Sequence, residues 1–232
     1  MSFDLTESKI ISHPIFSTTD ESIISSEIDE CVEKIVHWAE DFYGQDAIIQ
    51  AREDFFDSAG KVFHDDHFFH ERMSLFLDYF IFERKLQKNE GDIPESPFEA
   101  FSQLHEPHIT NFRHSMFEAA KATDTNLEIV DALTKERIKI SPRGLQRFDG
   151  IQKKDMFQGF LYKVGDQNYL SHGLIFHPKD SWRMMRKEIK KWRSKSDMNS
   201  FVKDLYLWAK TNLKSVRHAH VSPKVIYKSV II

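Results

Sequence analysis

The chain has 232 residues, of which 41% are hydrophobic and 29% charged, with only 8 glycines and 7 prolines. This composition excludes a disordered or fibrous protein and is sufficient for a globular core. The formal net charge of −4 combines an acidic N-terminal region with a basic C-terminal one. The single cysteine, Cys31, excludes a disulfide framework and a thiolate metal cage, and it indicates a reducing compartment.

The N-terminal residues predict an irregular arm over 1–19, where Pro14 stands in a Ser/Thr cluster. They have neither the basic segment nor the uninterrupted apolar segment of a signal peptide. No later apolar run approaches the roughly 20 residues of a membrane-spanning helix. We therefore expect a cytoplasmic protein without a transmembrane segment.

Apolar residues with a period of 3.6 predict a helical region over 20–114. Its first helix ends at Gly44 and its second at Gly60, because glycine is favoured just past a helix end. Ser96 and Pro97 begin a short helix, and Pro107 opens another that ends near Met116. The expected helices cover about 28–42, 46–59, 67–86, 97–104 and 107–116.

The helix after Gly60 is the most informative element, because it has a wide apolar arc and must be central. Its apolar side contains Phe69, Met73, Phe76 and Phe80. We place its N-cap at Asp65 or Asp66. The remaining narrow stripe is expected to face solvent and consists of His67, Glu71, Ser74 and Asp78, with His70 at its edge.

This stripe admits two interpretations. The first is a divalent metal site formed by His67, His70, Glu71 and Asp78, since a His and a Glu one helical turn apart can share a metal ion. The second is an ordinary solvated face. We prefer the second, because the two-histidine zinc helix requires histidines at i and i+4, and here they are three residues apart. No cofactor is expected, with a divalent metal as the alternative.

Short β-type segments follow and predict an antiparallel region over 115–178. Turns of hairpin length separate most of them, so successive strands should pair as a meander or a small barrel. We expect strands at 116–122, 127–132, 137–140, 156–164 and 169–176. Together with the helices, they predict an α+β fold that forms one compact unit.

The C-terminal region, 179–232, is expected to contain basic helices over 179–193 and 197–216, followed by a strand or a loose tail over 225–232. Its first helix has an apolar seam, while the rest of its surface is basic. The basic residues are Arg183, Arg186, Lys187, Lys190 and Arg193.

The charges are distributed unevenly along the chain. Residues 1–59 contain fourteen acidic and three Lys or Arg side chains, and residues 179–232 contain fourteen Lys or Arg and four acidic ones. A basic helix of this kind can bind nucleic acid, an anionic membrane or an acidic protein. Alternatively, the two oppositely charged regions face each other within the fold. No recognised nucleic-acid motif accompanies the basic helix.

Several segments between about residues 45 and 193 resemble an uncharacterised family of proteins from myxobacteria and related predatory bacteria. They include Ala51-Arg-Glu-Asp-Phe-Phe, Ala59-Gly-Lys-Val-Phe, Arg72-Met73, Ser115-Met-Phe-Glu and Leu174-Ile-Phe-His-Pro. The resemblance implies no activity. The family positions that correspond to His64, His67 and His70 are often other residues, which weakens the metal interpretation. The family positions that correspond to Arg52, Glu53, Asp66 and Arg72 match this sequence better. The resemblance therefore implies that these four side chains form a structural set of ion pairs.

The sequence contains no glycine-rich phosphate loop, nucleophile elbow or Cys/His metal spacing. We therefore expect a non-enzymatic, intracellular binding or adaptor protein that uses its basic C-terminal helices or an open sheet face. The expected partner is a protein or a nucleic acid. The alternative is a metal-dependent enzyme that uses the His/Glu/Asp stripe.

Overall fold

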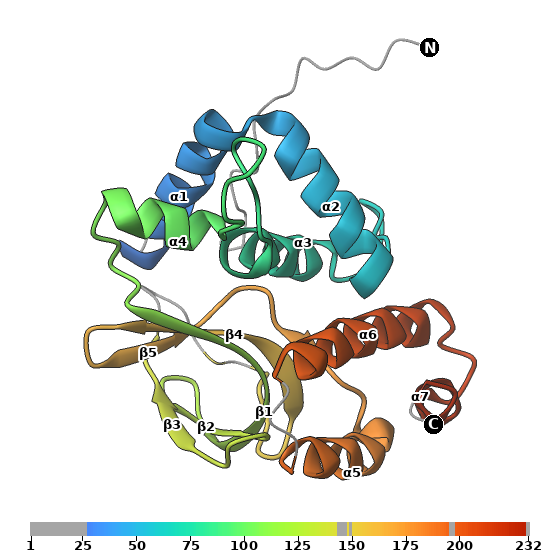
Figure 1. Cartoon of the computed structure of the whole chain (residues 1–232). Helices are drawn as coiled ribbons and strands as arrows, with labels where there is room; N and C mark the ends of the chain where they lie inside the picture. Colours follow the sequence, from blue (N-terminus) through green and yellow to red (C-terminus); the bar gives the residue numbers. More distant parts are fainter. Residues whose placement is uncertain (1–26, 143–147, 149, 195–197, 231–232) are drawn as a thin grey trace, which may run out of the picture.

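A computed structural model describes residues 27–142, 148, 150–194 and 198–230. It has an α+β fold in which a layer of N-terminal helices covers a strongly curved antiparallel sheet, and the C-terminal helices pack beside both (Figure 1). The predicted fold class is therefore confirmed. The arm predicted over 1–19 lies outside the described residues.

The helical layer consists of α1 (Glu27–Tyr43), α2 (Gln45–Ala59), α3 (Phe69–Asp78) and α4 (Pro97–Leu104). The apolar period of α1 places Ile28, Cys31, Ile35 and Ala39 in the core. The predicted start of α4 is correct: Ser96 forms a capping box with Glu99, and Pro97 occupies the first turn.

The helix α3 is central, as predicted, but only the N-terminal part of its polar stripe faces solvent. Ser74 and Asp78 are buried with Leu75, Phe76 and Leu77. The expectation of a solvated stripe was therefore wrong for Ser74 and Asp78, because the sheet covers this part of the helix, whereas His67 and His70 are exposed. After Asp78 the chain continues through a π-helical turn, η1 (Tyr79–Glu83).

The N-terminus of α3 also differs from the prediction. The helix begins at Phe69 and its N-cap is Phe68, in the left-handed region with φ 64° and ψ 27°. Asp66 accepts a hydrogen bond from the backbone nitrogen of Phe63 at 2.7 Å instead of capping the helix. An aromatic residue with positive φ is uncommon and costs about 1–2 kcal/mol of backbone strain.

The sheet has the strand order β3-β2-β1-β4-β5, and β6 pairs with β4 at the same edge as β5. Its strands are β1 (Asn111–Ala122), β2 (Leu127–Asp131), β3 (Arg137–Ile140), β4 (Met156–Val164), β5 (Gln167–Leu170) and β6 (Ile175–Phe176). A backbone hydrogen bond of 2.8 Å from Ser141 to Asn168 joins the two ends of the sheet, which is nearly closed as a barrel. The interior is apolar and includes Phe117, Ile129 and Phe157.

The predicted helix over 107–116 was wrong, because β1 begins at Asn111. Residues on this segment alternate: Phe112 and His114 pack with the helices, whereas Phe117 lies inside the barrel. That alternation is the period of a strand. The strand predicted over 169–176 is also interrupted, since residues 171–174 separate β5 from β6.

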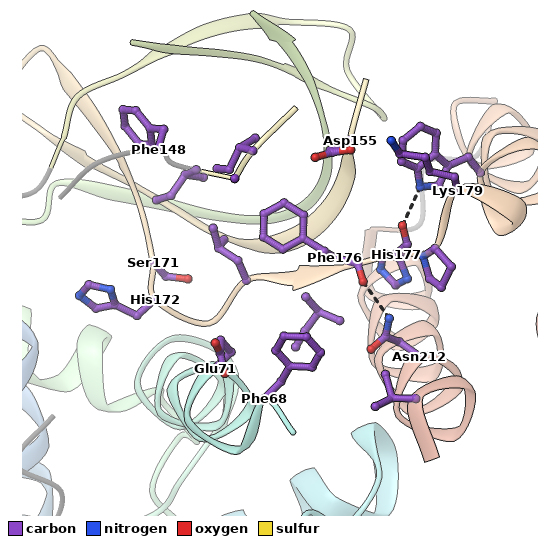
Figure 2. Close-up of a pocket in the computed structure, with 18 residues that line it drawn as sticks. Phe68, Glu71, Phe148, Asp155, Ser171, His172, Phe176, His177, Lys179 and Asn212 are labelled. Atoms are coloured by element: carbon purple, nitrogen blue, oxygen red, sulfur yellow. Dashed lines mark hydrogen bonds between the residues drawn. The ribbon is translucent and has the colours of Figure 1, made fainter. Parts of the chain in front are cut away.

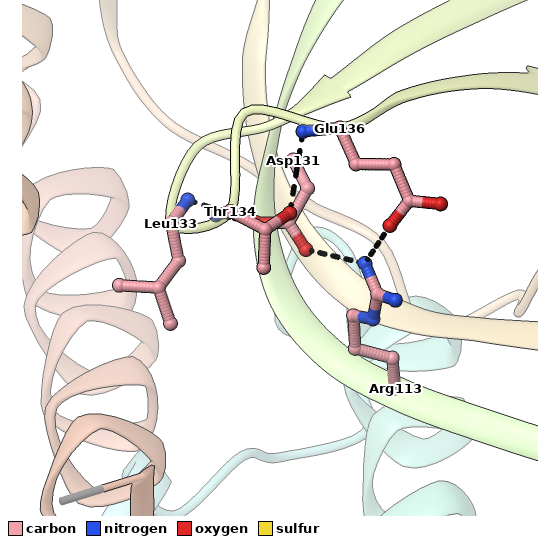
Figure 3. A network of polar contacts seen from close by, with 5 residues as sticks. All are labelled: Arg113, Asp131, Leu133, Thr134 and Glu136. Carbon is pink, nitrogen blue, oxygen red and sulfur yellow. Dashed lines mark hydrogen bonds and ion pairs between the residues drawn. The ribbon is translucent and has the colours of Figure 1, made fainter. Parts of the chain in front are cut away.

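A buried aspartate fixes the turn between β2 and β3 and ties it to β1 (Figure 3). One carboxylate oxygen of Asp131 accepts hydrogen bonds from the backbone nitrogens of Leu133 and Thr134, at 2.8 and 3.0 Å. The other pairs with Arg113 at 3.2 Å, and Arg113 also pairs with Glu136 at 2.7 Å. Desolvation lowers the pKa of Arg113, but hydrogen bonds to the two carboxylates outweigh it and leave this pKa raised.

The C-terminal region comprises η2 (Lys179–Ser181), α5 (Trp182–Trp192), α6 (Met198–Arg217) and α7 (Pro223–Lys228). Apolar side chains of α5 and α6 pack on the outer face of β1 and β4, where Met116 meets Met185, Ile189 and Trp208. The tail expected to be a strand or loose is helical over α7. Among the described residues, no helix has the length and apolar character needed to cross a membrane.

Candidate functional site

A cavity of about 610 Å³ lies at the mouth of the barrel, between the β5–β6 edge, the start of α3 and the last turns of α6 (Figure 2). This volume is within the range of small-molecule sites, roughly 300–1,000 Å³. Most of its lining is apolar. The apolar lining residues include Phe68, Phe148, Ile151, Leu170, Leu174, Ile175, Phe176, Trp182 and Val216.

Two phenylalanines in this cavity are unusually exposed. Phe68 is 45% exposed and Phe176 is 41% exposed, whereas the phenylalanines of the core are almost completely buried. Phe68 is also the residue with the left-handed backbone that caps α3. Strained residues of this kind occur preferentially at functional sites. The structure therefore holds two aromatic rings open to the same cavity, one of them at a cost in backbone strain.

The segment between β5 and β6 forms one wall of the cavity, and it is held against α3. Ser171 accepts hydrogen bonds from the backbone nitrogens of Gly173 and Phe160, at 3.2 and 3.4 Å. Gly173 lies directly on the backbone of Leu75. Next to it, Asp78 accepts a hydrogen bond from the hydroxyl of Tyr162. The conformation of this wall is thus fixed by contacts with the central helix.

His177 lies at the floor of the cavity and is fully buried within a polar network. The amide of Gln158 donates to the carbonyl of Leu205 at 2.9 Å, so its oxygen accepts from Nε2 of His177 at 3.2 Å. Nδ1 of His177 then accepts from the hydroxyl of Tyr227 at 2.7 Å. Burial, with a smaller effect of the nearby Arg72, lowers the pKa of His177 to about 3. The imidazole is therefore neutral, and both its nitrogens are occupied.

A second buried network connects α3 to α6 behind the cavity. Arg72 donates to the carbonyl of Ala209 at 3.1 Å and to the side-chain oxygen of Asn212 at 2.8 Å. Asn212 in turn donates to the carbonyl of Phe176 at 2.8 Å. Burial lowers the pKa of Arg72 to about 10, so the guanidinium remains charged at neutral pH. These bonds occupy the polar atoms of Asn212 that reach the cavity.

Few polar groups in the cavity remain available for a ligand. The carboxylate of Glu71 forms no hydrogen bond or ion pair with any residue that the structure describes. The hydroxyl of Ser171 accepts two hydrogen bonds, but within the described part of the chain no acceptor is seen for its own hydrogen. At the opposite end, one oxygen of Asp155 accepts from the backbone nitrogen of Gln152 at 2.7 Å. The sequence analysis singled out only Glu71 of these three residues.

The residues predicted as a metal site do not come together. His67 and His70 are exposed, and His67 precedes the helix. Glu71 is partly buried at the cavity, whereas Asp78 is buried two turns further along α3 and bonded to Tyr162. Among the residues that the structure describes, no group of three or more His, Cys, Asp or Glu side chains could hold a metal ion. This arrangement gives the metal-enzyme hypothesis no support.

The five predicted basic residues of α5 are all exposed, but they are not equivalent. Arg186 pairs with Glu118 on β1 at 3.0 Å, and Arg193 donates to the carbonyl of Ala132 at 2.8 and 3.1 Å. For Arg183, Lys187 and Lys190, no hydrogen bond or ion pair is found with the described residues. The five residues therefore divide into two that dock α5 on the sheet and three that face solvent.

Two contacts join α6 to the helical layer, but neither pairs a basic side chain of 179–232 with an acidic side chain of 1–59, so the internal explanation of the charge gradient stays a prediction. Arg217 pairs with Asp66, with one nitrogen–oxygen distance of 3.0 Å, and Lys210 donates to the carbonyl of Asp57 at 2.8 Å. The hydrogen bond to Arg217 is the main cause of the lowered pKa of Asp66. The implied ion-pair set around α3 is not formed as expected, since Asp66 pairs with Arg217 and Arg52 is exposed.

Sequence reasoning missed the cavity itself. Its walls come from the β5–β6 edge, α3, α6 and the residues Phe148 and Ile151, which are far apart in the chain. The nearest sequence signal was Phe68, directly before α3, which the helical pattern placed on the apolar side of the predicted helix. Comparisons with protein-family models, curated proteins and solved structures gave no match. The family resemblance therefore stays a prediction.

Proposed function

We propose that this chain is a non-enzymatic binding protein whose cavity at the barrel mouth holds a small, largely apolar ligand. One observation carries the proposal: Phe68 and Phe176 leave large fractions of their rings exposed inside a cavity of ligand size. Covering two such rings removes apolar area from water, at roughly 25 cal/mol per Å². Binding of an apolar molecule in the cavity should therefore be favourable in free energy.

The polar groups around the cavity also favour binding over reaction. His177 is neutral and bonded at both nitrogens, and Asn212 is bonded at both its amide oxygen and its amide nitrogen. Such groups keep the shape of the wall, because they are already engaged in hydrogen bonds within the protein. Cavities with an apolar lining and a few fixed polar groups are typical of small-molecule sites.

An apolar naphthalene dye that fluoresces on leaving water provides a direct test. We expect one dye per chain, with energy transfer from Trp182, which lines the cavity. Replacement of Phe176 by Ala should weaken binding about tenfold, because an aromatic contact contributes about 0.5–1.5 kcal/mol beyond the buried area. Ile93→Ala removes an apolar side chain that is 83% exposed elsewhere and should have no effect. Equal dye binding by wild type and Phe176→Ala would contradict the proposal.

A second candidate site is the basic face of α5, defined here as Arg183, Lys187 and Lys190. The observation in its favour is that these three side chains are exposed and lack ion-pair partners among the described residues, unlike Arg186. Three neighbouring cations on one helix favour an anionic partner, such as a nucleic-acid backbone or an acidic protein surface. This face can be tested independently of the cavity, because Arg183, Lys187 and Lys190 do not line it.

A further inference from the structure

We propose that the ligand of the cavity is an organic cation, an amine or ammonium group on an aromatic or aliphatic body, and that its positive group lies at Glu71. This inference rests on the proposed function, since it requires the cavity to be a binding site. To the proposed function it adds two points: the ligand carries a positive charge, and this charge lies at the end of the cavity where Glu71 stands.

Glu71 is the charged group of the cavity whose hydrogen-bonding capacity is unused. It lies in the first turn of α3, directly after the residues that place Phe68 in the cavity, and Figure 2 shows the two side chains next to each other. The carboxylate forms no hydrogen bond or ion pair with the described residues, although the nearby guanidinium of Arg72 attracts it electrostatically. A partly buried carboxylate gains more from a cation than a fully hydrated one does, because the effective dielectric constant is lower.

The cationic residues near the cavity are already engaged. Lys179 donates to the side-chain oxygen of Gln152 at 3.2 Å and lies 5.8 Å from the centre of the Trp182 ring. Arg72 is buried behind the wall and directs its two terminal nitrogens to Ala209 and Asn212. An anionic ligand would therefore compete with existing bonds at Lys179, and it would lie in a cavity that also contains the carboxylates of Glu71 and Asp155.

The aromatic lining favours a cation for a second reason. The face of an aromatic ring attracts positive charge within about 6 Å of its centre. Trp182 already has this contact with Lys179 and with Arg186, whose guanidinium carbon is 5.7 Å from the ring centre. Phe68 and Phe176 carry no such cation in the described structure, and their rings are open to the cavity. A cation between these rings and Glu71 would combine both attractions.

Three probes with one naphthylethyl body separate charge from shape: the primary amine, the alcohol and the carboxylate. Calorimetric titration of the full chain at pH 7 should give the tightest binding for the amine, about tenfold tighter than for the alcohol. The carboxylate should bind more weakly than the alcohol. In the Glu71→Gln variant, which keeps the shape of the side chain, the preference for the amine should fall to within about twofold while the affinity for the alcohol is unchanged.

Asp155→Asn is the matched control, because it removes one negative charge at the other end of the cavity, beside Lys179 (Figure 2). It should leave the amine preference intact. Loss of the preference in Asp155→Asn and not in Glu71→Gln would overturn the placement of the cation. Equal binding of the amine and the alcohol, or tighter binding of the carboxylate, would overturn the ligand class while the cavity remains a binding site. Failure of all three probes to bind at millimolar concentration would overturn the proposed function as well.

Discussion

Gly173 packs so closely on Leu75 that a Cβ atom added to the glycine would lie 2.5 Å from the backbone nitrogen of Leu75 and 2.6 Å from its Cα. A Cβ atom does not approach non-bonded backbone atoms this closely, so only glycine allows this wall of the cavity to touch α3. The same added atom would lie 2.9 Å from a carboxylate oxygen of Asp78. The helix that contains Glu71 and the cavity wall are thereby held in one arrangement.

The Gly173→Ala substitution should therefore destabilise the fold by about 2–3 kcal/mol, because backbone atoms have to move apart. Gly91→Ala is the control: an added Cβ there would meet nothing within 4 Å, and unlike Gly173 this glycine has a positive φ, 95°. It should cost only about 1 kcal/mol from backbone strain. Chemical denaturation of both variants checks this, and equal losses would show that the contact with Leu75 is unimportant.

The left-handed backbone at Phe68 leads to a second prediction. Phe68→Gly should raise the free energy of unfolding by about 0.5–1 kcal/mol, because glycine adopts positive φ without strain. The same change should weaken binding of the naphthalene dye, since it removes a ring from the cavity. Phe68→Ala removes the ring but keeps the strain, so it should weaken binding without the gain in stability. A stabilised glycine variant with full dye binding would separate Phe68 from the proposed site.

Because the buried His177 is neutral, we expect the folded protein to lose stability in mild acid. Its pKa is about 3 in the folded chain, whereas an unfolded histidine has a pKa near about 6.5. Below the unfolded value, only the unfolded state takes up a proton at this residue. The contribution of His177 to stability is therefore complete above about pH 6.5 and declines by about 1.4 kcal/mol per pH unit as the pH falls towards 3.

The His177→Gln variant isolates this titration. It loses hydrogen bonds to Tyr227 or Gln158 and should be less stable than wild type at pH 7. The difference in unfolding free energy between the two proteins should then narrow by about 2 kcal/mol between pH 7 and pH 5. Denaturant titrations at the two pH values provide the comparison. A constant difference would mean that His177 is protonated, or exposed, in the folded chain.

Most elements were predictable because their signal is local. The apolar period of α1 and α2 and the glycines at positions 44 and 60 gave their limits to within about two residues, and Ser96 with Pro97 gave the start of α4. The strands β2, β3 and β4 followed from short β-type segments between turns. These patterns depend on residues that are close together along the chain, so they can be recognised from the sequence alone.

The errors arose where distant parts of the chain decide the structure. Asp78 looks like a solvent-facing residue on a helical wheel, but Tyr162 and the segment at Gly173 cover it. The alternation that places Phe112 and His114 on one face of β1 and Phe117 on the other was hidden by the helix expected after Pro107. The cavity was not predictable, because it needs the β5–β6 edge and α6 to meet α3. Of its polar residues, only Glu71 had been singled out, and for a different role.

The division of the basic residues on α5 leads to the last prediction. Reversal of Arg183, Lys187 and Lys190 to Glu should leave the melting temperature within about 2 °C of wild type, because none has an ion-pair partner among the described residues. The single Arg186→Glu change places a carboxylate beside Glu118 and should destabilise the fold by about 0.5–1 kcal/mol, since that ion pair is only partly exposed.

If the basic face binds an anionic partner, the triple variant should lose all retention on a polyanion column while Arg186→Glu is largely retained. For duplex DNA, the logarithm of the affinity should fall with the logarithm of salt concentration, with a slope of about −0.9 per phosphate neutralised. A protein partner should instead give saturable binding, and a membrane should require anionic lipid. If wild type binds none of these at low salt, and the triple variant melts several degrees lower, then these three cations stabilise the fold and do not form a binding face.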